Sequence, residues 1–136
     1  MNITFSRRTD LALEAMRALL EAGGRLGRAE LARSIGTTSS FLPQVMAGLV
    51  RGGWVVSRRG PGGGYELTES AHQARLLQVI EATEGPSASG RCVLRDAPCP
   101  GDISCPIHAI WVEARRVLDD GFDEVFVLQT ELQGGN

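Results

Sequence analysis

Three cysteines and one histidine lie close together in this chain of 136 residues. Cys92, Cys99 and Cys105 are its only thiols, and His108 follows the last of them by three positions. Thiolates and imidazoles bind transition metals and iron–sulfur clusters. Glycine and proline residues between these ligands let the backbone wrap around such a group. The segment therefore predicts a metal or cluster site with these four side chains as ligands.

Two kinds of group compete for this donor set. Iron–sulfur clusters are held mainly by thiolates, and histidine replaces some of them in certain clusters. Structural zinc sites also take three cysteines and a histidine, but their paired cysteines are usually about two to four residues apart. The gaps here are six and five residues, which favours a cluster over zinc. Three unrelated thiols are the third interpretation, and an odd number of cysteines argues against a disulfide framework.

The residues before this segment carry the pattern of two helices followed by a turn. Thr9 to Ala22 has an apolar stripe at helical spacing, with Ser6 or Thr9 as its cap and two glycines at its end. Arg28 to Ser34 forms a second, short helix. Gly36 then allows the tight turn of a helix-turn-helix motif.

A third helix is expected to begin near Ser39 or Ser40, which are good caps. Pro43 limits this choice because proline is tolerated only in the first turn of a helix. Residues 54–56 and 65–67 are strand-like, and residues 60–64 read Gly-Pro-Gly-Gly-Gly between them. Helix, helix-turn-helix and hairpin in this order predict a mainly α fold, a winged helix.

The third helix and the hairpin carry side chains suited to DNA. A recognition helix places its first residues at base edges in the major groove, and an amide such as that of Gln44 can read adenine. Arginines at the base of the hairpin suit phosphate or minor-groove contacts, and its glycines allow a close backbone approach. Solvated or capping roles are the simpler alternative for each residue. The predicted DNA-binding residues are Arg28, Ser39, Ser40, Phe41, Gln44, Arg51, Arg58, Arg59, Gly60 and Gly62.

The charge distribution supports this division of the chain, although the net charge of −2 alone does not. Residues 1–70 hold nine arginines and six acidic residues, whereas residues 71–136 hold five arginines and ten acidic residues. A basic first half suits an anionic partner. A protein-interaction module is the competing function, and it gains weight if acidic side chains interrupt the basic face.

The rest of the chain is predicted to be helical. Residues 69–82 form a helix that links the winged helix to the cysteine segment, and residues 106–132 form a long helix interrupted at Gly121. The long helix has an apolar stripe that needs a cover. A second copy of the same helix in a two-fold homodimer is the simplest cover. Packing back onto the chain's own winged helix is the alternative.

Several stretches together resemble the Rrf-two family of bacterial winged-helix repressors. The wing RRGPGGGYEL is the most specific, and TDLALEAM, SSFLPQVMAGLVRGGWV and the three cysteines before a long helix extend the match over nearly the whole chain. The resemblance implies an iron–sulfur cluster in place of zinc. It also implies a regulator whose affinity for a palindromic operator in double-stranded DNA responds to iron, redox state or nitric oxide.

The resemblance leaves two candidates for the fourth ligand. In members of the IscR type, a histidine three residues after the last cysteine completes a [2Fe–2S] site, and His108 in CPIHAIW matches it. In members of the NsrR type, an aspartate from the first helix of the partner subunit completes a [4Fe–4S] site, and Asp10 in RRTDLAL matches it. A helix N-terminal acid stabilised by the helix dipole is the simpler role for Asp10.

The expected organisation has four parts. These are a winged-helix DNA-binding domain over residues 1–70, a linker helix and loop over 71–89, a cysteine cluster-binding loop over 90–106, and a dimerisation helix with a tail over 107–136. No apolar run approaches the roughly 18–20 residues of a membrane span, and the N-terminus lacks an apolar leader. We therefore expect a cytoplasmic homodimer without catalytic activity. A zinc-stabilised repressor is the alternative for the cofactor.

Overall fold

The first helix is set by its two caps. The computed structural model describes residues 2–86, 90–95, 97–101 and 105–129. Helix α1 spans Arg7–Ala22, because the Ser6 hydroxyl accepts a hydrogen bond from the Thr9 N–H at 3.2 Å and Gly23 adopts the left-handed conformation with φ 67°. The helix ends where predicted but begins two residues before the predicted Thr9, because Ser6 is the cap.

The helix-turn-helix motif is closed by a backbone motif that needs glycine. Helix α2 spans Arg28–Ser34, as predicted. Gly36 has φ 73°, and the next residue, Thr37, donates its N–H to the Ala32 carbonyl at 2.9 Å. This is a Schellman ending, which a side chain at position 36 would strain.

The recognition helix starts later than predicted. Helix α3 spans Leu42–Arg51, and Phe41 is its N-cap residue. Thr38 takes the capping role instead of Ser39 or Ser40, since its hydroxyl accepts from the Phe41 N–H at 3.1 Å and its carbonyl accepts from the Leu42 N–H at 3.0 Å. The extra turn delays the helix, and the proline still falls in the first turn.

The wing is a two-stranded antiparallel hairpin. Strand β1 (Val55–Arg58) pairs with β2 (Gly64–Leu67), with Val55 opposite Leu67. The turn has Pro61 followed by Gly62 at φ 72°, and the Gly63 N–H donates to the Gly60 carbonyl at 2.8 Å, the pattern of a type II turn. Leu26 exchanges two backbone hydrogen bonds with Tyr65 and ties the wing to the chain between α1 and α2.

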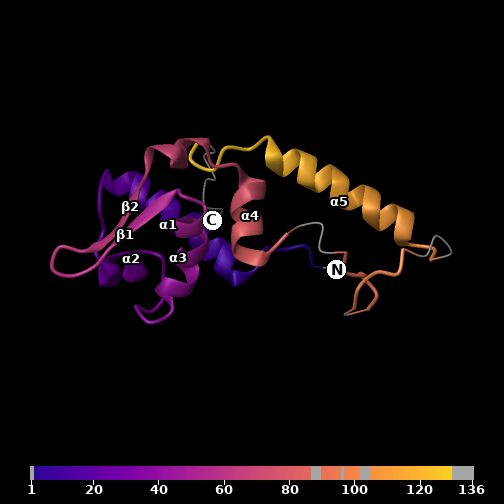
Figure 1. The fold of residues 1–136 in the computed structure, drawn as a ribbon, viewed down its shortest axis with the longest axis horizontal. Helices are drawn as coiled ribbons and strands as arrows, with labels where there is room; N and C mark the ends of the chain where they lie inside the picture. The colour runs from indigo at the N-terminus through magenta and orange to yellow at the C-terminus, as the bar shows by residue number, and fades with distance from the viewer. Residues whose placement is uncertain (1, 87–89, 96, 102–104, 130–136) are drawn as a thin grey trace.

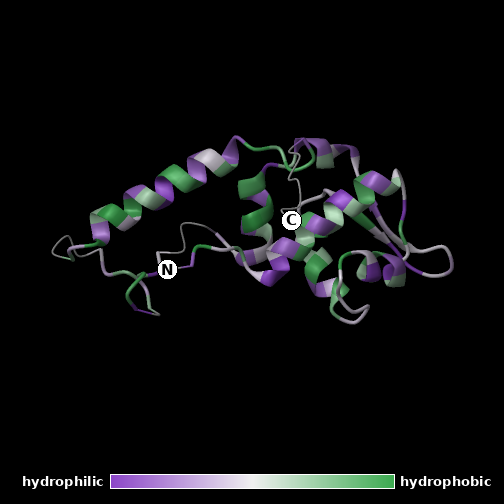
Figure 2. Cartoon of the chain, turned by 180° about the vertical axis from the view of Figure 1, so that it is seen from behind, coloured by the Kyte–Doolittle hydropathy of each residue, from purple (hydrophilic) through white to green (hydrophobic). Residues whose placement is uncertain are grey.

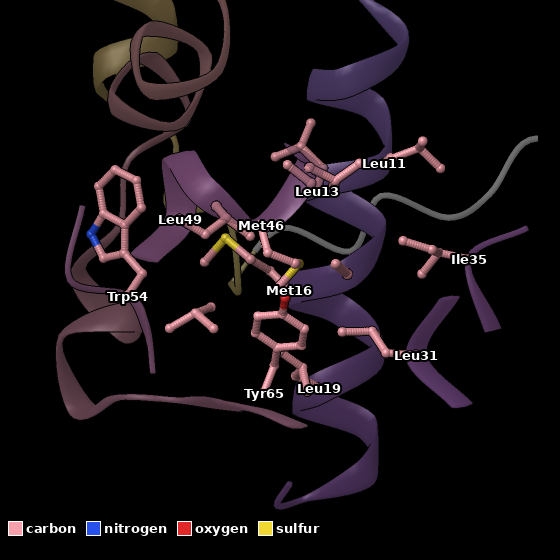
Figure 3. Close-up of a cluster of buried hydrophobic side chains, with 14 of the residues drawn as sticks. Leu11, Leu13, Met16, Leu19, Leu31, Ile35, Met46, Leu49, Trp54 and Tyr65 are labelled. Carbon is pink, nitrogen blue, oxygen red and sulfur yellow. The ribbon is translucent and has the colours of Figure 1, made fainter. Parts of the chain in front are cut away.

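The core lies between α1, α3 and the wing. Many of its largest side chains come from the predicted apolar stripes, but Leu11 and Leu31 were not predicted and the predicted stripe residue Leu20 is exposed. Trp54 and Tyr65 of the wing also belong to this core (Figure 3). The fully buried members include Leu11, Met16, Leu19, Leu31, Leu42, Val45, Met46 and Leu49.

The prediction of one continuous helix over residues 69–82 is wrong. The segment is divided into a 3-10 helix, η1 (Glu69–Gln73), and α4 (Leu76–Glu84). The break is held by distant residues, since the Leu76 N–H donates to the Val125 carbonyl at 2.8 Å and the Val127 N–H donates to the Ala74 carbonyl at 2.9 Å.

Helix α4 packs against α1 and α3 and contributes to the same core. At Gly48 of α3 the two helices touch so closely that an added Cβ would stand 2.5 Å from the Ala82 carbonyl oxygen. The end of α4 is therefore fixed against the recognition helix, directly before the chain enters the cysteine segment.

The last helix reaches away from the winged-helix body (Figure 1). Helix α5 spans His108–Asp123, so the predicted extent over residues 106–132 is wrong, and Gly121 lies within the helix instead of interrupting it. None of the 16 side chains of α5 is buried. Apolar and polar segments alternate along it in Figure 2. In the described part of the chain, no helix is long and apolar enough to cross a membrane.

The C-terminal end of α5 is anchored to the body. Phe122 meets Phe5 edge to face, with ring centroids 5.6 Å apart. Arg75 donates to the Asp123 carbonyl at 2.6 Å and lies over the Phe126 ring. The chain then turns back, and Val127 joins the core. The expected tail beyond residue 129 lies outside the described residues.

Candidate functional site

The cysteine segment begins as a small hairpin. Arg91 and Pro98 form an isolated antiparallel bridge, the Cys92 N–H donates to the Ala97 carbonyl at 3.0 Å, and the Cys99 N–H donates to the Gly90 carbonyl. The pairing holds Cys92 and Cys99 on adjacent extended segments. Residues 96 and 102–104 of the predicted loop lie outside the described residues.

Cys99 and His108 are in direct contact. Cys99 Sγ lies 3.4 Å from His108 Nδ1, and His108 is the first residue of α5. Two ligands of one tetrahedral metal, with bonds of about 2.3 Å to sulfur and 2.0–2.1 Å to nitrogen, stand about 3.5 Å apart. The observed separation is that of a sulfur–nitrogen hydrogen bond, and two ligands sharing one metal would stand equally far apart.

The four predicted ligands are only partly gathered. All three cysteines are half-buried free thiols, and Cys105 precedes α5, its carbonyl accepting from the His108 N–H at 3.2 Å. Within the described ranges, no group of three or more His, Cys, Asp or Glu side chains is placed to hold a metal ion. The donor types fit a cluster or zinc, and Cys99 and His108 are the two predicted ligands that the structure brings into contact.

A groove of about 520 Å³ runs between this loop and α5. Helical geometry puts its α5 residues on one side of the helix, because they recur every three or four positions from His108 to Asp120. The opposite side carries the exposed apolar residues Ile110, Val117 and Leu118, whereas Val112 lies on the groove side. The groove is lined by Gly90, Arg91, Cys99, Gly101, His108, Trp111, Val112, Arg115, Arg116, Asp119 and Asp120.

Trp111 in this groove was not predicted as a site residue. Its indole Nε1 is buried and has no hydrogen-bond partner among the residues that the structure describes. Tryptophan N–H groups usually find an acceptor when buried, and an unpaired one costs about 1–3 kcal/mol. Its position three residues after His108 was the only sequence signal for a role in the site. A tryptophan in an apolar stripe is more simply explained by packing.

The alternative ligand Asp10 is exposed in the first turn of α1. Beside it, a polar network ties α1 to the end of α4. The buried Thr9 hydroxyl lies 2.6 Å from that of Thr83 and donates to Glu84 Oε1 at 2.7 Å. Burial alone would raise the pKa of Glu84, but hydrogen bonds from the Ser6 N–H and from the Thr9 and Ser6 hydroxyls lower it below its ordinary value.

A second groove, of about 550 Å³, separates the recognition helix from the wing. Three of the predicted arginines line it, namely Arg28, Arg58 and Arg59, and none of its lining residues is acidic. Arg28 is held in place because its Nε donates to the Ser39 carbonyl at 2.8 Å. The groove therefore offers guanidinium groups to an anion without acidic competition.

The other predicted DNA-binding residues are spread around this groove. Gly60 belongs to its lining, and Ser39, Ser40 and Gln44 are exposed, whereas Phe41 is half-buried against the core. Arg51 donates to the Ala82 carbonyl at 3.1 Å. A shallow pocket groups Gln44 and Arg51 with Arg8, a basic residue that was not predicted. At the turn, Gly62 has the positive φ expected of it.

Comparison with known proteins identifies relatives over most of the chain. The sequence model of one family, described as Rrf2, iron-dependent transcriptional regulator, matches residues 5–129. HTH-type transcriptional regulator IscR of Pectobacterium carotovorum subsp. carotovorum (strain PC1) is 33% identical over 108 residues, which cover 79% of this chain. The chain spans 65% of the length of that protein.

Solved structures agree with the fold. CymR of Staphylococcus aureus superposes with a TM-score of 0.71 at 20% identity, covering 96% of this chain and 100% of that one. IscR of T. potens superposes with a TM-score of 0.69 at 20% identity, covering 100% of this chain and 95% of that one. The predicted winged helix followed by a long helix is thereby confirmed.

Proposed function

Because the chain belongs to the Rrf2 family, we propose that it is a homodimeric DNA-binding transcription regulator whose operator affinity is controlled by an iron–sulfur cluster. Its relatives are named transcriptional regulators, a role without catalysis, as predicted. Residues 1–70 would read DNA, residues 90–106 would hold the cluster, and residues 107–136 would form the dimer. Iron status, redox state or nitric oxide is the signal we propose.

The observation that carries DNA binding is the basic groove between α3 and the wing. Arg28, Arg58 and Arg59 meet there without an acidic neighbour in the lining. With the start of α3 in the major groove, Ser39, Ser40 and Gln44 would approach bases and backbone. The two wing arginines would lie along a phosphate backbone or in the adjacent minor groove.

Binding to a duplex selected from a random pool tests this interface. Arg59→Ala should weaken binding about tenfold, which equals about 1.4 kcal/mol, and should reduce the slope of log affinity against log salt by about 0.9. Arg116→Ala is the matched control, because Arg116 is exposed on α5 and pairs with Glu113 and Asp120. Unchanged affinity of the Arg59 variant at physiological salt would refute the wing assignment.

Dimer formation rests on the unburied face of α5. Ile110, Val117 and Leu118 are 71%, 55% and 39% exposed and, with Ala114, form a stripe at positions i, i+4, i+7 and i+8. A second copy of this helix would cover the stripe in a two-fold dimer. The two recognition helices would then meet half-sites about 34–36 Å apart on a palindromic operator.

The mass of the protein in solution tests the dimer. Val117→Asp should convert it to a monomer, because a carboxylate would be buried in the paired stripe. Val112→Asp is the control, since Val112 is similarly exposed, at 53%, but faces the cysteine groove. A Val117→Asp variant that still has the mass of a dimer in solution would contradict the proposed interface.

The cluster assignment is supported by the contact of Cys99 with His108 at 3.4 Å. Cys92, Cys99 and Cys105 would supply thiolates, and His108 would be the fourth ligand, with Asp10 of the partner subunit as the alternative. The group, when bound, supplies redox chemistry and reactivity towards oxidants and nitric oxide. Its gain or loss would shift the winged helices or order the loop.

Anaerobic reconstitution of the variants tests the ligands. Cys92→Ala, Cys99→Ala and Cys105→Ala should each abolish the visible absorbance of the cluster, and a normal spectrum would exclude that residue. Asp10→Ala and His108→Ala distinguish the two fourth ligands and thereby the [2Fe–2S] and [4Fe–4S] alternatives. The spectrum should change in only one of these two variants.

Zinc remains the second candidate for the site, because the separation of Cys99 and His108 fits a zinc centre equally well. A zinc-stabilised repressor would be colourless, with one zinc per chain after anaerobic purification. Iron and inorganic sulfide in the purified protein would exclude it. The protein-interaction module is less well supported, since acidic side chains do not line the basic groove.

A further inference from the structure

The indole N–H of Trp111 is buried but donates no hydrogen bond within the described residues. A buried N–H without a partner indicates an acceptor that binds from outside the chain, or one that moves into place when the surrounding residues rearrange. The question is which acceptor this position would meet.

The surroundings of Trp111 narrow the choice. Trp111 lies one helical turn after His108 on α5, and both line the groove that Cys99 closes from the loop side. Cys99 Sγ already contacts the His108 ring. The groove therefore brings the proposed ligands Cys99 and His108 close to the unpaired N–H of Trp111. A thiolate that lines the groove would accept a hydrogen bond from this N–H.

We infer that Trp111 is a positioning residue whose indole N–H donates a hydrogen bond to a ligand sulfur of the loaded cysteine site. Cys99 Sγ, on the wall of the same groove, is the acceptor that we expect. The inference rests on the proposed function for the presence of a cluster, but it applies equally to zinc held by the same thiolates. Partners of this kind orient ligands and tune the bound group.

The hydrogen bond should affect the reduction potential of a bound cluster. The positive end of an N–H dipole directed at sulfur stabilises additional negative charge, so it favours the reduced form of a cluster. Trp111→Phe keeps an aromatic ring in the groove but removes the donor. It should therefore shift the reduction potential of the reconstituted cluster to a more negative value.

Two measurements on the full chain test the inference. The first compares the reduction potential of the wild type with those of Trp111→Phe and Trp54→Phe, where Trp54 is the matched control from the core, at 8% exposure. The second follows the two indole N–H signals by NMR when Zn²⁺ alone is added to the anaerobic, reduced apoprotein. The Trp111 signal should move downfield and exchange more slowly, while the Trp54 signal stays in place.

The outcomes separate this inference from the proposed function. If a cluster assembles but Trp111→Phe leaves its potential unchanged, or zinc leaves the Trp111 signal unmoved, the inference is overturned and the proposed function stands. If only zinc binds and the Trp111 signal moves, the inference holds and the proposed cluster is refuted. If neither group binds, both are overturned.

Discussion

The winged-helix body and the α5 arm of the same chain contrast in how they use their side chains. In the body, α3 buries Leu42, Val45 and Leu49 completely or nearly so, and α4 packs closely enough on it to require Gly48. In the arm, α5 buries none of its side chains, and Ile110 is 71% exposed. The body buries its apolar side chains in one core, which Val127 joins after α5, whereas the apolar stripe of the arm is exposed.

This difference locates where the chain can respond to its surroundings. A packed core has few alternative arrangements, and segments with few buried contacts occupy the low end of the stability range within one protein. The predicted ligands, of which no three are grouped to hold a metal ion in the described ranges, and the unpaired Trp111 donor belong to the arm and its loop. The body would carry the DNA-binding surface, and the arm would carry the parts that change.

The largest expected effect comes from truncating the same residue type in the two regions. Val45→Ala in α3 should cost about 2–3 kcal/mol of unfolding free energy, because it removes two buried methyl groups and leaves a cavity. Val112→Ala in α5 should change it by less than about 0.5 kcal/mol. Urea denaturation of both variants measures the difference, and equal costs would break the contrast.

A glycine pair gives effects of opposite sign. Gly48→Ala should destabilise by about 1–3 kcal/mol, because the new methyl group meets the Ala82 carbonyl and α3 or α4 must shift. Gly121→Ala meets nothing within 4 Å and should stabilise α5 by up to about 1 kcal/mol, since alanine is the better helix former. Thermal unfolding of both variants is the measurement. A stabilising Gly48→Ala would show that the two helices are not closely packed.

The smallest effect is pH-dependent and lies where the body meets the loop. The depressed pKa of Glu84 means that its hydrogen bonds stabilise the fold above the unfolded-state pKa, and that this contribution is lost as pH falls through the folded value. Glu84→Gln should therefore lower stability at pH 7 by under about 1 kcal/mol, and the difference should shrink as pH falls through the folded-state pKa of Glu84.

Local signals predicted the elements that local chemistry sets. The boundaries of α2, the glycine turn at Gly36 and the hairpin follow from caps, turn residues and apolar spacing within a few positions. The start of α3 was misplaced because four consecutive hydroxyl residues, Thr37 to Ser40, all suit a cap, and only the folded turn selects Thr38.

Distant contacts decided what was missed. The helix expected over residues 69–82 is broken at Ala74 and Arg75 by contacts with residues some fifty positions away. The Val127 N–H donates to the Ala74 carbonyl and the Leu76 N–H donates to the Val125 carbonyl, on either side of a bridge between Arg75 and Phe126. The four predicted ligands were chosen from their residue types in the segment itself. Their separation could not be predicted, because only the contact of the loop with α5 sets the distance from Cys99 to His108.

Gly64 at the base of the wing has a consequence for the DNA partner. Its φ is 139°, and any side chain there would collide with the Leu26 carbonyl, to which the next residue, Tyr65, is hydrogen-bonded at 2.9 Å. These contacts hold the wing at a set distance from α3. A duplex whose groove width does not match this distance must bend or change its groove width. The elastic energy of the DNA would therefore contribute to the choice of operator.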